Sequence, residues 1–161
     1  MVTLWVVNTS PIILLGKVGL VDLLQQLGPT VVIPEAVALE IQRRGPSDPA
    51  VQALTQAAWL TTVDPGPTAA TVAAYHLHPG ESAVLTYALA NPGSGVILDD
   101  LRARSCAASL GIPYQGTIGA VIYAKQQGWI PAARPVVERL RQEGMYLSDQ
   151  LMNQVLAQVG E

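Results

Sequence analysis

Residues 4–11 have the sequence LWVVNTSP, and this stretch decides the fold. Its first four residues are apolar, and a strand that is apolar on both faces must be covered on both, as in a parallel sheet. Ser10 is a favoured helix cap and Pro11 suits the first turn of a helix, so we expect a helix to begin here. Because open α/β sheets bind ligands at the carboxyl ends of their strands, we expect a functional site beside Asn8.

Strands and helices are expected to alternate along the rest of the chain. Apolar or alternating segments predict strands at 30–33, 59–63, 95–98 and 112–114. Helical periodicity and turn residues predict helices at 12–17, 19–27, 34–44, 48–57, 68–75, 78–90, 101–110, 116–127, 131–143 and 148–159. This alternation indicates a mostly parallel sheet, with 59–63 and 112–114 at its edges.

The composition is that of a globular protein with one domain. The 161 residues are half hydrophobic and only 13% charged, so the chain is not disordered. The net charge of −3 argues against a protein that coats nucleic acid through a broad basic face. Cys106 is the only cysteine, which excludes an internal disulfide, and its apolar neighbours predict that it is buried. We recognise neither a signal peptide nor a membrane span, and we expect a reduced, cytoplasmic protein.

The charges are distributed unevenly along the chain. Residues 45–101 contain five acids and no lysine or arginine, and basic residues stand on either side of this segment. An acidic centre with basic flanks could hold a cation while the flanks contact phosphates; the flanking residues are Arg43, Arg44, Arg102 and Arg104. The alternative is that these charged residues are simply distributed over the solvated surface, and composition alone favours this interpretation.

Acidic residues near predicted strand ends are the candidates for chemistry, and each has a structural alternative. Asp99 and Asp100 directly follow a strand, and capping of the next helix would account for one of them. Glu81 lies in the first turn of a helix, where an acid interacts favourably with the helix dipole. Glu40 either pairs with Arg43 or Arg44 on its own helix or points along the sheet edge.

His76 and His78 are two residues apart, but no third ligand of the zinc type lies near them in the sequence, and we do not expect a zinc site. Converging carboxylates need a cation, a proton or an arginine, because two carboxylates ~5 Å apart repel by about 3 kcal/mol at an effective dielectric of 20.

Four motifs, in order, resemble those of the PIN-domain superfamily, and more narrowly those of small prokaryotic proteins grouped with VapC-type toxins. They are VVNTSPII at 6–13, VIPEAVALEI at 32–41, GESAV at 80–84 and LDD at 98–100. The later segments GTIG at 116–119, GWI at 128–130 and GMYLS at 144–148 are similar to the same subgroup. The resemblance implies a three-layer α/β/α sandwich of four to five strands over residues 1–161, with helices at about 131–161 packing as an extension.

The resemblance also implies a ribonuclease that depends on Mg²⁺ or Mn²⁺. By position, the family's acids correspond to Asn8, Glu40 and Glu81, and the fourth to Asp99 or Asp100, with Asp100 slightly favoured. Ser10 matches a hydroxyl beside the first acid. Asn8 departs from the pattern, because an amide oxygen can ligate a cation but carries no charge and cannot accept a proton from water.

Three hypotheses follow from the sequence. The first is a PIN-like endoribonuclease that acts on RNA as a homodimer and is the toxin of a pair with a small protein antitoxin. The second is a binding module with the same fold and a weakened centre, which holds RNA or a protein without cutting. The third is another phosphate-binding α/β domain, which the absence of glycine-rich phosphate loops disfavours.

Overall fold

A single five-stranded sheet forms the centre of the computed structural model, which describes all 161 residues. Its strands are β1 (Leu4–Val7), β2 (Thr30–Pro34), β3 (Leu60–Val63), β4 (Ser94–Ile97) and β5 (Tyr114–Gln115). All neighbouring strands are parallel and follow the order β3-β2-β1-β4-β5. The predicted parallel sheet is confirmed, and the two segments expected at its edges lie there.

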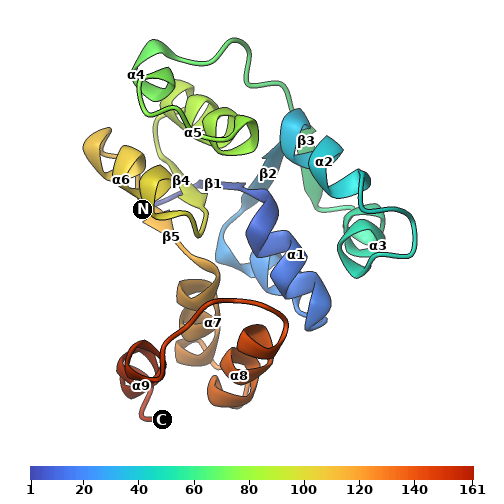
Figure 1. Ribbon diagram of the computed structural model, residues 1–161, viewed down its shortest axis with the longest axis vertical. Helices are drawn as coiled ribbons and strands as arrows, with labels where there is room; N and C mark the ends of the chain where they lie inside the picture. The colour runs from blue at the N-terminus through green and yellow to red at the C-terminus, as the bar shows by residue number, and fades with distance from the viewer.

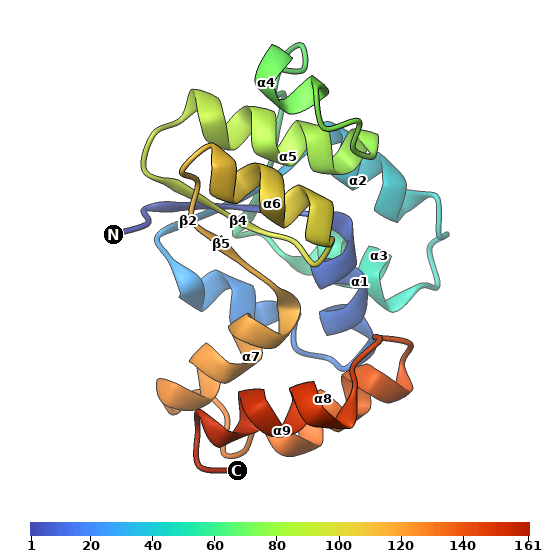
Figure 2. The same cartoon turned by 60° about the vertical axis from the view of Figure 1, so that its left-hand side comes forward.

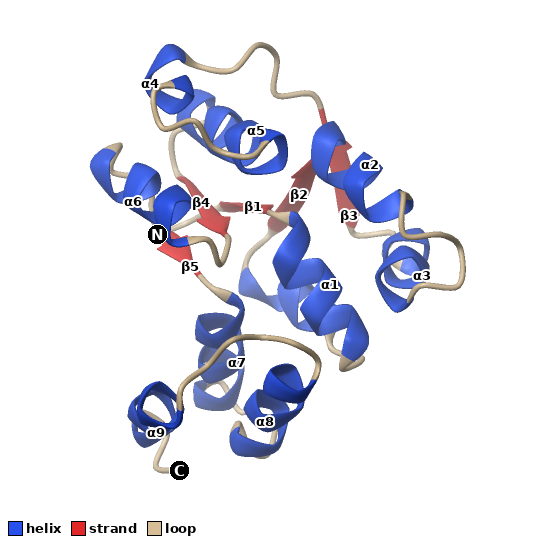
Figure 3. Cartoon of the chain, in the orientation of Figure 1, coloured by secondary structure: helices blue, strands red, loops and turns tan.

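Helices cover both faces of this sheet. They are α1 (Thr9–Lys17), the 3-10 helix η1 (Val21–Leu27), α2 (Glu35–Gln42), α3 (Pro49–Gln56), α4 (Ala70–Ala73), α5 (Pro79–Ala90), α6 (Leu101–Ser109), α7 (Thr117–Gln126), α8 (Arg134–Gln142) and α9 (Asp149–Ala157). Helix α5 packs on β1, β2 and β4 and contacts α6, whereas η1, α1 and α7 contact one another below the sheet (Figures 1 and 3). The result is the three-layer α/β/α arrangement that the sequence predicted.

Strands β1 and β4 are neighbours in the sheet although they are far apart in the sequence. From β1 the chain continues to β2 on one side, and from β4 it continues to β5 on the other. Val7 pairs with Ile97, and the backbone N–H of Asn8 donates to the Ile97 carbonyl at 2.9 Å. The carboxyl ends of these two strands therefore form the topological switch point, where open α/β sheets bind ligands.

The central strands are buried, as their apolar sequences predicted. Val6, Val7, Val96 and Ile97 have no exposed surface, because helices cover them from both sides. Cys106 is also fully buried, as expected, and this burial raises the pKa of its thiol.

Several helix boundaries differ from those predicted. Helix α1 begins at Thr9, and Asn8 rather than Ser10 occupies its N-cap position, so the expectation that Ser10 caps this helix was wrong. The segment 19–27 forms only a 3-10 helix, and the segment 68–75 contains only the four helical residues of α4, whose N-cap position, Ala69, has no capping side chain. Asp48 caps α3, because its side chain accepts a hydrogen bond from the Ala50 N–H.

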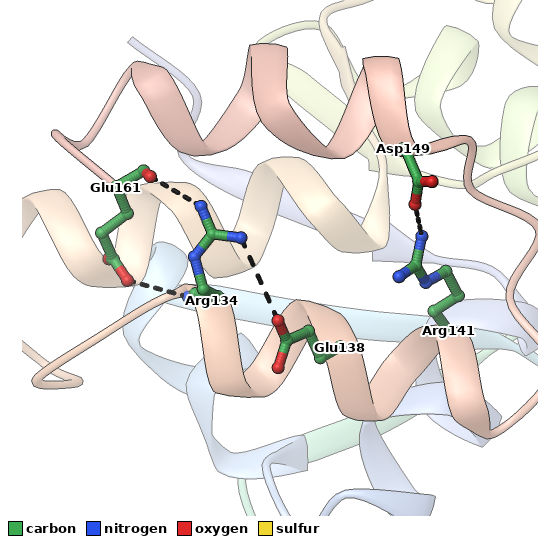
Figure 4. Close-up of polar contacts among 5 residues, drawn as sticks. All are labelled: Arg134, Glu138, Arg141, Asp149 and Glu161. Carbon is green, nitrogen blue, oxygen red and sulfur yellow. Dashed lines mark hydrogen bonds and ion pairs between the residues drawn. The ribbon is translucent and has the colours of Figure 1, made fainter.

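The last two helices pack against α7, away from the sheet (Figure 2). Polar contacts join them: Glu161 accepts hydrogen bonds from the backbone N–H groups of Ala133 and Arg134 at 2.8 and 3.0 Å, and Figure 4 shows Glu161 beside Arg134. These hydrogen bonds lower the pKa of Glu161. A second contact, between Arg141 and Asp149, joins α8 to α9.

None of the helices combines the length and the apolar character that crossing a lipid bilayer requires.

Candidate functional site

A cleft of about 320 Å³ opens at the carboxyl end of β1. Three segments supply its walls: the start of α1, the middle of α2 and the start of α5. We call it the acid cleft, and its lining residues are Asn8, Thr9, Ser10, Ile13, Glu40, His78 and Glu81. Folding thus brings together four of the residues proposed from the sequence, which come from three distant motifs.

Glu40 is held in the acid cleft by its neighbour across the sheet edge. The Thr9 hydroxyl donates a hydrogen bond of 2.8 Å to Glu40 Oε2. Glu40 forms no ion pair with Arg43 or Arg44, which was the alternative role for it. Arg44 instead pairs with Asp48 at 2.9 Å. The Glu40 carboxylate is therefore free of basic partners.

Gly80 allows two oxygen atoms to approach the same point on α5. A Cβ atom at this position would lie 3.1 Å from Glu40 Oε2 and 3.3 Å from Asn8 Oδ1. Both distances are tighter than ordinary van der Waals contact, so any side chain here would crowd the two oxygens. The amide of Asn8 makes no capping hydrogen bond to α1, and its oxygen faces the same space as the Glu40 carboxylate.

Glu81 lies in the first turn of α5, as predicted, and its surroundings disfavour its ionised form. Its carboxylate accepts a hydrogen bond of 3.2 Å from the backbone N–H of His78, at the N-terminus of α5. Burial raises the pKa of Glu81, and the negative charge of Asp100 raises it further. The hydrogen bond and the charge of His78 lower this pKa in part, and Glu40 adds the smallest increase. Two other acids of the predicted set therefore act on the Glu81 carboxyl.

The two adjacent aspartates are oriented differently. Asp100 caps α6, accepting a hydrogen bond of 2.9 Å from the Ala103 N–H, as predicted for one of the pair. Asp99 accepts three hydrogen bonds, from Ser10 Oγ at 2.9 Å and from the N–H and Oγ1 of Thr117 at 2.8 and 2.7 Å. Asp99 lines the hollow next to the acid cleft, and Ser10 belongs to both.

The four arginines proposed for phosphate contact lie in different environments. Arg44 pairs with Asp48, Arg102 donates to the carbonyl of Tyr75, and Arg43 is exposed at the C-terminus of α2. Arg104 stacks over the ring of Tyr114, with its guanidinium carbon 5.2 Å from the ring centroid. None of them forms an ion pair with a candidate acid.

The donor set suits a hard divalent cation. None of the carboxylates of Glu40, Glu81, Asp99 and Asp100 is paired with a basic side chain. No three acidic, histidine or cysteine side chains are close enough to enclose a metal ion by themselves. Mg²⁺ commonly binds one or two protein carboxylates and keeps several waters, so Glu40 and the Asn8 oxygen, which meet at Gly80, fit such an ion with Glu81 beside them.

Sequence reasoning missed three residues that shape the site. Thr9 positions Glu40, Thr117 holds Asp99 while being fully buried, and Gly80 makes room for the cleft oxygens. Thr117 belongs to the GTIG segment, which follows an edge strand, and this position was the only feature of the sequence that pointed to it. The roles of Thr9 and Gly80 depend on contacts with residues far away in the sequence.

Comparison with known proteins adds one finding. A family model described as the PIN domain matches residues 4–161, which is nearly the whole chain. No curated protein is similar enough to the chain to count as a match.

Proposed function

This chain belongs to the PIN-domain family, and we propose that it is an endoribonuclease that uses Mg²⁺ or Mn²⁺. Proteins of this family are generally nucleases, and they usually use divalent metals. The observation that carries the proposal is the set of carboxylates without basic partners around Asn8, at the switch point of the sheet. Such a set requires a positive charge, and a phosphodiester substrate requires the same charge at the same place.

Each residue of the acid cleft has a role in this proposal. Glu40 and the Asn8 oxygen would hold the ion, with Thr9 keeping the Glu40 carboxylate oriented. Glu81 would accept the proton of the attacking water, because a raised pKa brings a carboxylate closer to the working pH of a base. When bound, a divalent ion would stabilise the charge that develops on the phosphoryl oxygens.

The test is cleavage of single-stranded RNA with Mg²⁺ or Mn²⁺ and with EDTA. We expect metal-dependent cleavage that Glu40→Gln, Glu81→Gln or Asp100→Asn reduces by about 10²–10⁴-fold, the usual range for a lost proton-transfer or charge-stabilising group. Glu35→Gln is the matched control, because Glu35 is an exposed acid on α2 outside the acid cleft. Cleavage that resists EDTA would contradict the proposal.

Asn8 supports a second candidate function. An amide at the position of the family's first acid lowers the negative charge of the site, which would weaken metal binding. The chain would then be a module that binds RNA or protein without cutting it. RNA binding without metal-dependent cleavage would favour this candidate.

We also propose a cellular role, a protein partner and an oligomeric state for this chain. As a toxin, the chain would act in the cytoplasm and be inhibited by a small protein antitoxin, and it would form a homodimer. Light scattering over a range of concentrations tests the dimer, and co-expression with a neighbouring small gene product tests the antitoxin. A monomer mass at all concentrations would contradict the proposed homodimer.

A further inference from the structure

The acid cleft continues into two further depressions of the surface. It shares Ser10 and Ile13 with a second hollow of about 610 Å³. That hollow shares Asp99, Met145 and Tyr146 with a third depression of about 700 Å³, which we call the aromatic groove. One continuous path therefore leads from the candidate site, past Asp99, into the groove.

Exposed apolar side chains are concentrated in the aromatic groove. Its walls come from α6, β5, α7, α9 and the segment before α9, and Figure 1 shows α9 lying beside α7. Of the seven large hydrophobic residues that are exposed in this chain, four line it: Leu101 (78% exposed), Tyr114 (43%), Tyr146 (94%) and Leu151 (46%). Apolar surface gathered in this way marks a binding site.

The polar groups of the groove indicate what it binds. Its only charged side chains are Asp99 and Arg104, and Arg104 lies over the face of Tyr114. Three glutamines complete the polar lining, and an amide side chain offers both a donor and an acceptor; they are Gln115, Gln126 and Gln158. Aromatic faces, a cation and amide groups together are suited to unpaired nucleobases and their phosphates.

We infer that the aromatic groove binds the unpaired bases of single-stranded RNA beside the scissile phosphate, with Tyr114 and Tyr146 as stacking surfaces. This inference rests on the proposed function, because it places the phosphodiester in the acid cleft. Asp99 lines both the second hollow and the aromatic groove, so a strand leaving the acid cleft reaches the groove through that hollow. Bases inside a duplex are stacked on one another, so the groove selects single strands.

A second copy of this chain is the alternative occupant, and the position of the groove disfavours it. A protein seated against Tyr146 and Asp99 would cover the path to the acid cleft and block the substrate. Arg104 also places a positive charge beside Tyr114, where a strand in the groove would bring its phosphates.

The experiment measures binding of a labelled single-stranded oligoribonucleotide to the full chain by fluorescence anisotropy in EDTA, where metal-dependent cutting cannot occur. We expect Tyr114→Ala and Tyr146→Ala each to weaken binding by about 5- to 150-fold, the range for loss of one base–aromatic stack. Tyr114→Phe and Tyr146→Phe keep the ring and should bind like the unsubstituted protein. Leu89→Ala, an exposed apolar residue of α5 outside the groove, is the control.

The outcomes separate this inference from the proposed function. Unchanged RNA affinity in both alanine variants, with cleavage intact, would overturn the inference and leave the nuclease. Lost affinity in both, for a protein that never cuts RNA, would support the groove and overturn hydrolysis. Unchanged affinity together with a change from dimer to monomer in Tyr146→Ala would show that the groove joins two copies, and this would also overturn the inference.

Discussion

The Ser10 hydroxyl donates a hydrogen bond of 2.9 Å to Asp99 Oδ2, across 89 positions of sequence. Ser10 follows β1 and Asp99 follows β4, the two strands that meet at the switch point of the sheet. The bond therefore ties together the two strand ends between which we place the substrate. Ser10 is the second residue of α1 rather than its N-cap, so its hydroxyl is available for this contact.

Removal of the Thr117 hydroxyl should loosen Asp99. Thr117→Val is nearly isosteric and removes the 2.7 Å hydrogen bond from Oγ1 to Asp99, while the backbone N–H remains. We expect the free energy of unfolding to fall by about 1.5–3 kcal/mol, the value for a hydrogen bond to a charged group, in urea denaturation. Thr117→Ser keeps the hydroxyl and should retain most of the stability. Equal stability of the valine variant would mean that Asp99 does not depend on this contact.

Restoring a carboxylate at position 8 should strengthen metal binding. In Asn8→Asp, a negative charge is added where the amide oxygen faces Glu40, so we expect at least tenfold tighter Mg²⁺ binding by isothermal titration calorimetry and faster RNA cleavage. Without metal, repulsion between the two carboxylates should lower the melting temperature. A variant with unchanged Mg²⁺ affinity would place the ion elsewhere.

Glu81 should make the metal-free protein less stable at neutral pH than at mildly acidic pH. Its pKa is raised in the folded state, so the folded protein binds this proton more tightly than the unfolded chain does. Stability linked to Glu81 is therefore present below the ordinary value of 4.5 and is lost as the pH rises through the raised folded value.

Glu81→Gln removes this dependence and tests it. In EDTA at pH 7 to 8, the glutamine variant should melt at a higher temperature than the unsubstituted protein, and the difference should shrink as the pH falls toward 4.5. With saturating Mg²⁺, the unsubstituted protein should instead melt at the higher temperature, since a cation favours the ionised carboxylate. A glutamine variant that is less stable at every pH would show that the hydrogen bond from the His78 N–H stabilises the fold more than repulsion from Asp100 and Glu40 destabilises it.

A methyl group at position 80 should disturb the site without unfolding α5. Gly80→Ala favours the helix by about 0.5–1 kcal/mol, but its Cβ would lie 3.1 Å from Glu40 Oε2. We expect a helical content like that of the unsubstituted protein by circular dichroism, with RNA cleavage reduced at least tenfold. Full cleavage by this variant would indicate that Glu40 has room to move and is not held as described.

Glu161 should stabilise α8 in a pH-dependent manner. Its pKa is lowered by the hydrogen bonds from Ala133 and Arg134, so its contribution is present above the ordinary value of 4.5 and is lost as the pH falls through the lowered value. Glu161→Gln should therefore lower the melting temperature at pH 7, and the two proteins should converge as the pH falls below 4.5. Glu138→Gln, which removes only a 4.0 Å contact with Arg134, is the control and should have little effect.

The sequence by itself determined the parallel sheet, its two edge strands and most of the helices, and it predicted that one of Asp99 and Asp100 caps a helix. Each of these depends on local properties, namely hydrophobic periodicity, side-chain capping and breakers such as Gly and Pro, which a single segment already contains. The sequence also predicted that Asn8, Glu40, Glu81, Asp99 and Asp100 lie together at one edge of the sheet. The first three line the acid cleft, whereas Asp99 lines the neighbouring hollow and Asp100 caps α6.

Only the tertiary structure decided how the candidate groups are used. Asp99 and Asp100 are adjacent in the sequence, yet one joins Ser10 and Thr117 and the other caps a helix, because their side chains leave the backbone in different directions. The crowding at Gly80 and the walls of the aromatic groove likewise arise where distant elements pack. Such contacts depend on strand order and helix placement, and these are settled by packing of the whole chain rather than by any one segment of it.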